Sequence, residues 1–416
     1  MGRGLYTLLL RISLPFIMVR LWWRGRREAG YREHVAERFG RYTVQPEANL
    51  IWLHAVSVGE ARASAPLVRG LLRELPNFEL LITCTTASGR ATLEQVFGET
   101  VRIAYLPYDF PETAQRFLAH FKPRLGIVME TEVWPNLLAV CQQACVPVML
   151  ANARLSRKSA RGYRRFAKLT RPAFAAFSAV CAQSARAARR LRWLGARHTL
   201  VTGNLKFDVE PDAAKVSEGY AFKASLRGRK VLLLASTREG EEARLLDGLR
   251  KDDDGTLVIL VPRHPQRFDD VAALIEIGGF SFARRSLGQA PHTQRRVYLG
   301  DTMGEMSFYY TLADVAVIGG SFLPLGGQNL IEACGAGVPV VFGPSMFNFA
   351  EAAQLALQAG AAVQVTDARE AIGVARALLA DQRRCTQMGL AGSRLCAAHR
   401  GATERHLETC GRLLDL

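Results

Sequence analysis

The sequence lacks the features that would identify a metal-binding or repeat protein. Among its eight cysteines only Cys141 and Cys145 lie near one another, and no zinc-ligand spacing occurs. Buried, reduced thiols in a protein that faces the cytoplasm fit this pattern. No short repeat or low-complexity run is visible, and the acidic run Asp252–Asp254 lies between an expected helix and an expected strand, where a solvated turn is typical. We therefore expect no metal site and no cofactor.

Acidic residues are scarce as well. The 416 residues include 54 Lys or Arg against 38 Asp or Glu, which gives a net charge of +16 and a pI of about 9.9. This charge indicates a polyanionic partner: nucleic acid, an anionic membrane surface or a phosphorylated substrate. Charge alone does not choose between them. At 49% hydrophobic, the chain is long enough for two domains of roughly 200 residues each.

An uninterrupted membrane-spanning run is also missing. Leu5–Trp23 is strongly apolar, but Arg11 and Pro15 interrupt it, and a spanning helix needs about 20 apolar residues. A signal peptide is disfavoured because there is no small-residue cleavage site and positive charge follows the apolar stretch: Arg20, Arg24, Arg26 and Arg27. We expect a helix seated at the headgroup level of the cytoplasmic leaflet. The alternative is an ordinary first helix packed on its domain.

The remainder alternates apolar strands with helical segments, which is typical of an α/β protein with parallel sheets. A polar stretch of low order, Asp208–Ser217, is expected to separate two such series. The first series has strands at Leu50–His54, Glu79–Thr83, Arg102–Tyr105, Leu125–Met129, Val146–Ala151, Ala179–Ala182 and Thr199–Val201. The second has strands at Lys230–Ala235, Gly255–Val261, Phe280–Ala283, Arg296–Leu299, Val315–Ile318, Val338–Phe342 and Ala362–Val365. Two doubly wound domains in tandem predict a ligand cleft at the carboxyl ends of their strands.

The Gly-rich segment 326–344 is the clearest candidate for a nucleotide pocket. Gly326 and Gly327 would open a helix, let the backbone approach a phosphate and leave free N–H groups for it. Glu332, in the first turn, could accept both hydroxyls of a ribose. The alternative is a tight loop in which Glu332 only complements the helix dipole.

In the first domain, Glu60 follows the strand Leu50–His54 and lies at a helix N-terminus. A lone carboxylate in that place suits a general base that takes a proton from an attacking hydroxyl. A carboxylate that only caps the helix is an equally good interpretation.

A second acidic site follows the strand Leu125–Met129. Glu130 and Glu132 precede a rigid Trp-Pro pair, so at least one of them is expected to face the cleft. Arg90 could pair with either acid or hold an anionic group of a substrate. Arg154, at another strand end, and Lys206, where the domain closes, are further candidates for contacts with an anionic sugar.

Four turns of the second domain share the strand-end position. Ser236 and Thr237 form a small-residue turn whose hydroxyls would cap a helix and cradle a phosphate. Arg263 and His264 lie in a stiff, basic loop between two prolines, which suits a nucleotide clamp, although a plain basic turn is the alternative. Gly turns follow at 300–306 and 318–322, and four such loops at one edge of a sheet favour a binding site.

Taken together, the motifs resemble those of the 3-deoxy-D-manno-octulosonic acid (Kdo) transferases, lipid A glycosyltransferases of the GT-B fold. The resemblance extends over nearly the whole chain, and only its last motif is shared widely with other GT-B enzymes. The motifs are HAVSVGE at 54–60, TTASGR at 85–90, METEVWPN at 129–136, NARLS at 152–156, GNLKFD at 203–208, AST at 235–237, PRHPQR at 262–267, GDTMGEM at 300–306 and GGQNLIEACGAGVPV at 326–340.

The resemblance implies two Rossmann-like domains: an acceptor-binding domain over 28–207, after a membrane helix at 1–27, and a CMP-Kdo-binding domain over 208–416. This division leaves room for the last helix to cross back. The implied reaction moves Kdo from CMP-Kdo to lipid IVA, the phosphorylated and acylated disaccharide precursor of lipid A. It proceeds with inversion and without a metal, at the cytoplasmic side of the inner membrane.

The resemblance also assigns roles to the residues. Glu60 would be the general base, and Arg90 with an acid of the Glu130/Glu132 pair would be needed for activity. Spacing does not decide between the two acids, and we favour Glu132. Arg154 and Lys206 would contact substrate anions. The implied donor-binding residues are Ser236, Thr237, Arg263, His264, Gly304, Met306, Gly326, Gly327, Asn329 and Glu332.

Two alternatives stay open. A GT-B transferase with a UDP-sugar donor would keep Glu332 and the Gly loops but should lack the SVGE and ETEVWPN pair. A non-catalytic nucleotide or RNA binder would use the net charge. The sequence shows no basic tract interleaved with exposed aromatic residues, so we expect no nucleic-acid partner.

Overall fold

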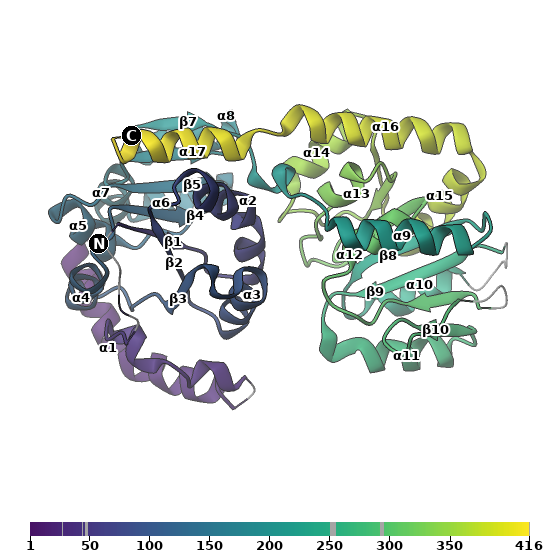
Figure 1. Ribbon diagram of the computed structural model, residues 1–416, viewed down its shortest axis with the longest axis horizontal. Coiled ribbons are helices and arrows are strands. Elements are labelled where there is room, and N and C mark those ends of the chain that lie inside the picture. Colours follow the sequence, from purple (N-terminus) through teal and green to yellow (C-terminus); the bar gives the residue numbers. More distant parts are fainter. Residues whose placement is uncertain (27, 44, 46–48, 250–254, 292–294, 416) are drawn as a thin grey trace. The chain divides into compact units, whose positions relative to one another are not determined.

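The computed structural model describes residues 1–26, 28–43, 45, 49–249, 255–291 and 295–415. The chain forms two compact units, and the first is built from two separate segments. Residues 1–209 and 399–416 make up the first unit, and residues 210–398 make up the second. Figure 1 labels the helices and strands of both units.

The first unit contains seven strands, with helices between them. Its strands are β1 (Leu50–His54), β2 (Glu79–Cys84), β3 (Arg102–Tyr105), β4 (Leu125–Met129), β5 (Val148–Ala153), β6 (Ala179–Ala182) and β7 (Thr199–Val201). Its α-helices are α1 (Arg3–Arg24), α2 (Val58–Glu74), α3 (Ala87–Phe97), α4 (Pro111–Phe121), α5 (Pro135–Gln143), α6 (Arg157–Arg165), α7 (Ala167–Ala175), α8 (Ala185–Trp193) and α17 (Ala402–Leu413). Short 3-10 helices are η1 (Ala29–Tyr31), η2 (Val35–Phe39), η3 (Gly98–Thr100) and η4 (Leu205–Asp208).

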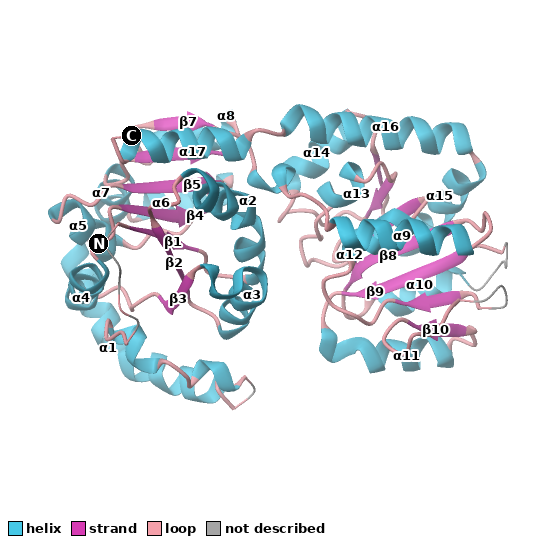
Figure 2. Ribbon diagram, viewed as in Figure 1, coloured by secondary structure: helices cyan, strands magenta, loops and turns pink. Residues whose placement is uncertain are grey.

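The second unit repeats this plan (Figure 2). Its strands are β8 (Val231–Thr237), β9 (Leu257–Pro262), β10 (Phe282–Arg284), β11 (Val297–Leu299), β12 (Val315–Ile318), β13 (Val340–Phe342) and β14 (Ala362–Gln364). Its helices are α9 (Ala213–Ser225), α10 (Glu241–Leu249), η5 (Pro265–Arg267), α11 (Phe268–Ile277), α12 (Met306–Leu312), α13 (Ile331–Gly335), α14 (Ala350–Gln358), α15 (Ala368–Ala380) and α16 (Gln382–His399).

Both sheets are parallel throughout the described strands, as predicted. The first has the order β3-β2-β1-β4-β5-β6-β7 and the second the order β10-β11-β9-β8-β12-β13-β14. All fourteen predicted strands are present, with boundaries that shift by at most two residues. The prediction succeeds because strands covered by helices on both faces are apolar along their whole length. In each sheet the strand that comes first in the sequence, β1 or β8, lies in the interior of the sheet. The chain adds strands first on one side of it and then on the other, and this reversal creates a topological switch point.

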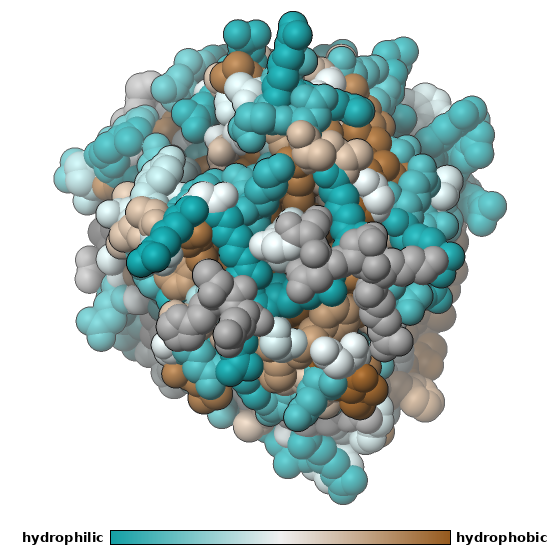
Figure 3. All heavy atoms as spheres, turned by 90° about the vertical axis from the view of Figure 1, so that its right-hand side faces the viewer, coloured by the Kyte–Doolittle hydropathy of each residue, from teal (hydrophilic) through white to brown (hydrophobic). Residues whose placement is uncertain are grey.

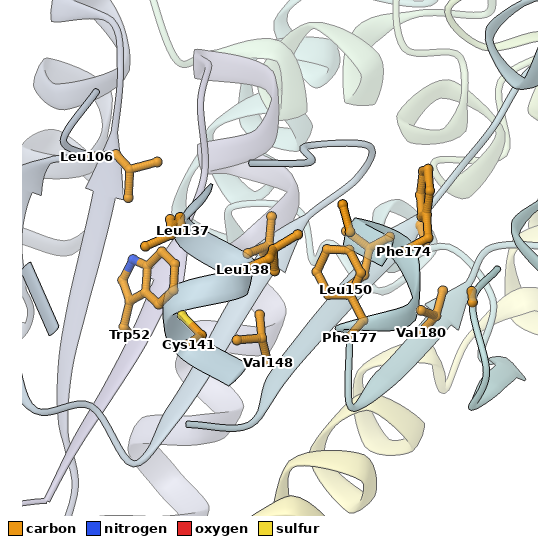
Figure 4. Packing of buried hydrophobic residues seen from close by; sticks show 14 of the residues in the cluster. Trp52, Leu106, Leu137, Leu138, Cys141, Val148, Leu150, Phe174, Phe177 and Val180 are labelled. Carbon is orange, nitrogen blue, oxygen red and sulfur yellow. The ribbon is translucent and has the colours of Figure 1, made fainter. Parts of the chain in front are cut away.

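Helices cover both faces of the first sheet and bury its core. Trp52 of β1 is fully buried on the face that α4 and α5 cover, near Leu137 of α5 (Figure 4). Its ring meets that of Phe117 edge-on at a centroid distance of 5.0 Å. Its indole N–H donates to the Thr83 hydroxyl at 2.7 Å, so the polar atom of this side chain is satisfied as well. The helices α2 and α17 contribute to the core on the opposite face. This core fixes the carboxyl ends of β1 and β4.

The chain returns to the first unit at its C-terminus. Asp208 accepts the N–H groups of Gly401 and Thr403 at 2.9 and 2.5 Å, just before and within the first turn of α17. The helix then packs on α2 and η4. A carboxylate at a helix N-terminus is favourable both as a hydrogen-bond acceptor and for the helix dipole.

The polar stretch Asp208–Ser217 is more ordered than predicted. Helix α9 begins at Ala213, and Asp212 caps it by accepting the N–H groups of Ala214 and Lys215 at 3.0 and 3.1 Å. The prediction of a low-order linker is therefore wrong for the second half of this stretch. The polar residues that predicted a linker are in fact the capping residue Asp212 and the exposed first turn of α9.

Helix α1 lies on the first unit through one face. Tyr6 donates to Asp109 at 3.0 Å, Thr7 is within 3.2 Å of the Asn136 side-chain oxygen, and Arg11 pairs with Glu112 at 3.1 Å. Its other face is exposed and apolar, with Leu5, Leu8, Leu9, Ile12, Phe16, Val19, Trp22 and Trp23. The helix is long and apolar enough to cross a membrane. It combines features of both predicted alternatives, because it packs on its domain and still exposes an apolar face.

The surfaces and the thiols are those of an ordinary reduced α/β protein. Seven cysteines are buried and Cys145 is exposed, and none of the eight forms a disulfide. Hydrophilic residues predominate on the face seen in Figure 3, where the apolar residues are scattered. A continuous apolar patch on that face is therefore not a feature of the described residues.

Candidate active site

The acids of the first unit lie at its topological switch point. Glu60 follows β1, and Glu130 and Glu132 follow β4, the neighbouring strand on the other side of the reversal. Loops that leave neighbouring strands in opposite directions open a crevice at the sheet edge, where ligands bind in this architecture. Glu60, Glu130 and Glu132 therefore lie at the same edge of the first sheet.

Glu60 is the third residue of α2 and forms part of its cap. The Ser57 hydroxyl accepts the Glu60 N–H at 3.4 Å, and the Glu60 carboxylate accepts the Val56 N–H at 2.8 Å. The capping interpretation is therefore correct as geometry. In this geometry the Glu60 carboxylate is half-buried, and only part of its capacity to accept hydrogen bonds is used.

The surroundings of Glu60 raise the pKa of its carboxyl into the neutral range. Burial raises the pKa of this carboxyl to about 7, against the lowering effect of the Val56 hydrogen bond. The negative charges of Glu130 and Glu132 raise it further, and Arg154 lowers it. A carboxylate with this pKa is matched to proton transfer at neutral pH.

Glu130 differs sharply from Glu60, because it is buried and doubly paired. Its oxygens contact Arg154 at 2.6 Å and Lys206 at 3.3 Å. Burial on its own raises the pKa of Glu130, but the two cations outweigh that effect and lower it. Glu130 also has a left-handed backbone with φ of 55°, which is uncommon for a residue with a side chain. Arg154 and Lys206, predicted to contact substrate anions, thus have a carboxylate of the protein as a partner.

Glu132 is half-buried and has no ion pair with any residue that the structure describes. Burial raises the pKa of its carboxyl, and the nearby charge of Glu130 raises it further. Tyr163 of α6 donates to the Thr131 carbonyl at 3.3 Å, and its phenol responds to the charge of Glu132. Of the two acids, Glu132 is therefore the one whose carboxylate has no ion-pair partner among the described residues. Its role in activity stays a prediction, as does the choice between the two.

Arg90 does not pair with Glu130 or Glu132, so that expectation is wrong. Its guanidinium contacts Glu37 at 2.9 Å and Glu94 at 3.1 Å. Glu37 is buried and also accepts the Tyr105 N–H at 2.7 Å, which makes it a strong anchor for the arginine. Sequence reasoning missed Glu37 because it lies in η2, which precedes the first strand, so it does not follow any strand in the sequence.

The loops of the second unit follow four neighbouring strands in the order β11-β9-β8-β12. Gly319, after β12, lies against the end of β8: a Cβ there would be 2.5 Å from the Ser236 carbonyl oxygen and from the Thr237 Cα. Only glycine permits this approach. The switch point between β8 and β12 is therefore lined by backbone, with few side chains in between.

Ser236 and Met306 are brought together, as the donor-site prediction requires. Ser236 has φ of 56°, and its hydroxyl donates to the Met306 sulfur at 3.9 Å. Thr237 is buried at the last position of β8. Gly304, in the loop before α12, has φ of 81° and open space around its Cα.

The predicted helix cap by Ser236 and Thr237 is wrong. Helix α10 begins four residues later, at Glu241. The fully buried Glu241 carboxylate accepts the N–H groups of Arg238 at 2.9 Å and Gly320 at 2.6 Å. It also accepts that of Phe322 at 2.9 Å. These donors were candidates for a phosphate, and a carboxylate of the chain already satisfies them.

Gly326 and Gly327 do not open a helix. Their φ values of 90° and 74° are left-handed, which a right-handed helix excludes, and α13 begins only at Ile331 and spans five residues. Asn329 organises the helix start, since its side chain accepts the Ile331 N–H at 3.1 Å and donates to Glu332 at 2.8 Å. The Glu332 side chain is exposed in the first turn, as predicted.

Helix α12 joins two of these segments. Met306 at its start contacts Ser236, and Tyr310, one turn later, donates to the Asn329 carbonyl at 3.4 Å. Burial raises the pKa of Tyr310 well above its usual value, with Glu332 contributing. The predicted donor residues at 236, 306, 329 and 332 thus form one connected group.

The basic loop after β9 gathers positive charge. Burial lowers the pKa of His264, and the charges of Arg238, Arg263 and Arg267 lower it further. Arg263 is anchored at the switch strand through its N–H, which donates to the Thr237 carbonyl at 2.9 Å. Arg267 pairs with Glu242 at 3.5 Å. This loop can present cations to an anion beside the end of β8.

Metal-ligand chemistry finds little support in the residues that the structure describes. Among them, no group of three or more His, Cys, Asp or Glu side chains is arranged to hold a metal ion. The run Asp252–Asp254, predicted to be a solvated turn, lies outside the described residues.

Comparison with known proteins identifies the family. Residues 33–209 match the family model for 3-deoxy-D-manno-octulosonic-acid transferase (kdotransferase). The chain is 48% identical to the 3-deoxy-D-manno-octulosonic acid transferase of Bordetella pertussis and 34% identical to that of Haemophilus influenzae. Each alignment covers 98% of this chain and 98% of the relative.

A solved structure of low sequence identity supports the fold. The UDP complex of MnaA from S. aureus is 17% identical, with a TM-score of 0.61 over 88% of this chain and 97% of that chain. It supports the GT-B fold, built of α/β units, that the sequence predicts. The full-length identities show more: the chain belongs to the 3-deoxy-D-manno-octulosonic acid transferase family and is a glycosyltransferase enzyme.

Proposed function

We propose that this chain transfers Kdo from CMP-Kdo to a hydroxyl of lipid IVA, with inversion and without a metal ion. The observation that carries the proposal is Glu60, a carboxylate with a pKa of about 7 at the switch point of the first unit. Family membership supports the transfer of Kdo. The acceptor, the stereochemistry and the absence of a metal are inferences from the chemistry below.

Glu60 acts as the general base on the acceptor. It takes the proton of the acceptor hydroxyl while the hydroxyl oxygen forms a bond to the anomeric carbon of Kdo. The bond between that carbon and the CMP oxygen breaks, and its electron pair leaves with CMP. A single displacement of this kind inverts the anomeric centre and needs no covalent enzyme intermediate.

The second unit supplies donor binding. The departing phosphate gains charge, and the cations around His264, Arg263 foremost, are suited to stabilise it. Glu332, held by Asn329 at 2.8 Å, is suited to accept the hydroxyls of the ribose. CMP is a weakly basic leaving group, so fixed positive charge can replace a metal ion in this step.

The exposed face of α1 supports an inner-membrane location on the cytoplasmic side. Leu8, Ile12 and Phe16 are 53, 60 and 75% exposed, while Tyr6 and Arg11 bind the domain. A helix held to its domain by one side and apolar on the other is suited to lie in the membrane interface. A lipid acceptor would then reach the first unit without leaving the bilayer.

A transfer assay tests the proposal directly. With CMP-Kdo and lipid IVA in neutral detergent, we expect Kdo-lipid product at the same rate with and without EDTA. Mass spectrometry identifies the lipid product, and the rate of CMP release compares turnover with and without EDTA. No product would overturn the donor or acceptor assignment, and activity that EDTA abolishes and Mg²⁺ restores would overturn the metal-free mechanism.

Substitution of Glu60 separates its catalytic role from its capping role. Glu60→Gln keeps an oxygen that accepts the Val56 N–H but is not basic, so kcat should fall roughly 100- to 10,000-fold. Thermal stability and CMP-Kdo affinity should change little. Glu60→Ala, which also removes the cap, should lose stability by about 1 kcal/mol as well. Near wild-type turnover in Glu60→Gln would show that the residue only caps α2.

The pH profile reports the ionisation of Glu60. The base must be ionised, and burial raises its pKa to about 7, so kcat/KM should fall about tenfold per pH unit below that value and level off above it. The charge of Glu132 helps to raise this pKa. Glu132→Gln should therefore move the acidic limb to lower pH. A limb that stays in place in this variant would contradict the assignment of the limb to Glu60.

Membrane association depends on the exposed face of α1 in this proposal. Replacing Leu8, Ile12 and Phe16 together with Gln should move most of the protein from the membrane fraction to the soluble fraction, with its melting temperature retained. The matched control replaces Tyr220, Ile277 and Leu287, which are 66, 79 and 63% exposed in the second unit. Equal partitioning of both triple variants would contradict the role of α1.

A further inference from the structure

The positive charge of this chain is concentrated in one stretch of the first unit. Residues 133–207 contain 14 Lys or Arg and not one Asp or Glu, which leaves 40 cations against 38 acids in all the rest. Nearly the whole net charge of +16 therefore comes from 75 residues. Sequence reasoning treated the charge as a property of the whole chain and missed this.

Much of this charge lines one hollow. The helices α6 and α8 line a solvent-open concavity of about 710 Å³, which we call the arginine hollow. Six arginines line it: Arg157, Arg161, Arg164, Arg165, Arg189 and Arg190. Six like charges around one cavity repel one another, and an anion in the cavity would relieve that repulsion.

The protein itself supplies no counter-charge. Among the described residues, no carboxylate forms an ion pair with any of the six arginines. Arg190 donates to the Leu155 carbonyl at 2.6 Å, and Arg164 lies over the ring of Trp193 at 4.6 Å from its centroid. These contacts hold two of the guanidinium groups in place without neutralising them. A site with fixed guanidinium donors and no acid is suited to phosphate, which arginine binds in bidentate fashion.

The arginine hollow adjoins the acids described above. Leu155, which Arg190 contacts, follows Arg154, the partner of Glu130. Helix α6 carries arginines of the hollow and also Tyr163, which binds the Thr131 carbonyl next to Glu132. Helix α6 thus lines the hollow and also contacts the loop that carries Glu132, so the two sites lie on neighbouring parts of the first unit. A phosphorylated disaccharide carries both a hydroxyl and a phosphate that these two sites could bind.

We propose that the arginine hollow binds a phosphate group of the lipid acceptor and so determines specificity for a phosphorylated headgroup. This inference rests on the proposed function, because it takes the acceptor hydroxyl to lie at Glu60. One phosphomonoester brings up to two negative charges to a site that has none of its own.

Other polyanions fit the hollow less well. A flat bilayer meets protruding cations, whereas these six line a concavity, and the apolar face of α1 is better suited to the bilayer. Single-stranded nucleic acid needs aromatic rings free for stacking, and Arg164 covers one face of Trp193. Trp193 and Phe166 are nevertheless 45 and 49% exposed within a basic tract, so the sequence-based argument that such a tract is absent is wrong.

The test compares two variants of equal charge. Arg161, Arg165 and Arg189 are exposed and form no side-chain hydrogen bond or ion pair within the described residues, so replacing all three with Gln should preserve the fold. The control replaces Arg41, Arg69 and Arg197, which are exposed in the same unit outside the hollow. In neutral detergent, the hollow variant should raise KM for lipid IVA at least about tenfold, with kcat and KM for CMP-Kdo within about twofold. The control should match the wild type.

A dephosphorylated acceptor identifies the group that the hollow recognises. With lipid IVA stripped of its phosphates, the wild type and the hollow variant should have the same KM. The proposal would be overturned if the hollow variant had the same increase in KM, relative to the wild type, on both acceptors. It would also be overturned if the hollow and control variants did not differ. A hollow variant that loses binding to phosphatidylglycerol vesicles while its KM in detergent is unchanged would likewise overturn it, since the ligand would then be the bilayer.

Equilibrium binding separates this inference from the proposed function. Binding of lipid IVA in neutral micelles, measured by calorimetry, needs no turnover. If the wild type binds lipid IVA and the hollow variant binds it about tenfold more weakly, the hollow is confirmed even where no Kdo is transferred. If the wild type transfers Kdo and both triple variants bind lipid IVA as tightly as the wild type does, the proposed role of the hollow is contradicted, whereas the proposed function is not.

Discussion

The buried ion pair of Glu130 with Arg154 and Lys206 is the interaction on which the chemistry of the first unit depends. Burying a carboxylate is costly, and here two cations at 2.6 and 3.3 Å compensate for it. Glu130 therefore stays charged inside the protein. That fixed charge raises the pKa of Glu60 and of Glu132, its neighbours at the sheet edge. The acidity of the proposed base therefore depends, in addition to burial, on a charged group with which it forms no contact of its own.

Distant parts of the chain hold this ion pair in place. The Asn152 N–H donates to His406 of α17 at 3.0 Å, and the Asn152 side chain accepts the Leu205 N–H at 3.1 Å. The segment of Asn152 also carries Arg154, and the segment of Leu205 also carries Lys206. These are the two cations that pair with Glu130. Burial lowers the pKa of His406 to about 4, so its ring stays neutral and keeps an acceptor for Asn152. The returning C-terminal helix therefore supports the catalytic edge as well as the core.

The strands and their acids could be predicted from the sequence, and the reason is local. A parallel strand buried on both faces is an apolar run, and a residue that follows such a run must lie at one edge of the sheet. Glu60, Glu130 and Glu132 were found in this way.

The errors share another cause. Arg90 pairs with Glu37, 53 positions away, and Glu241 binds the N–H of Gly320, 79 positions away. Both contacts depend on tertiary packing that no local pattern encodes. The same holds for Gly326 and Gly327, because a Gly-Gly pair in the sequence is as typical of the left-handed loop found here as of a helix start. The arginine hollow was missed for the opposite reason: its signal, a stretch without acids, is plain in the sequence but is lost when charge is summed over the whole chain.

Capping and catalysis are compatible in Glu60 because its two oxygens do different work. Oε2 accepts the Val56 N–H at 2.8 Å, a full hydrogen bond that fixes the side chain and completes the cap of α2. Oε1 is only 3.5 Å from the Ser57 hydroxyl, at the limit of a hydrogen bond, so its lone pairs are available to a proton. The cap lowers the pKa and burial raises it, and burial prevails. A base held by one oxygen and open at the other needs little reorganisation when it takes a proton from the acceptor.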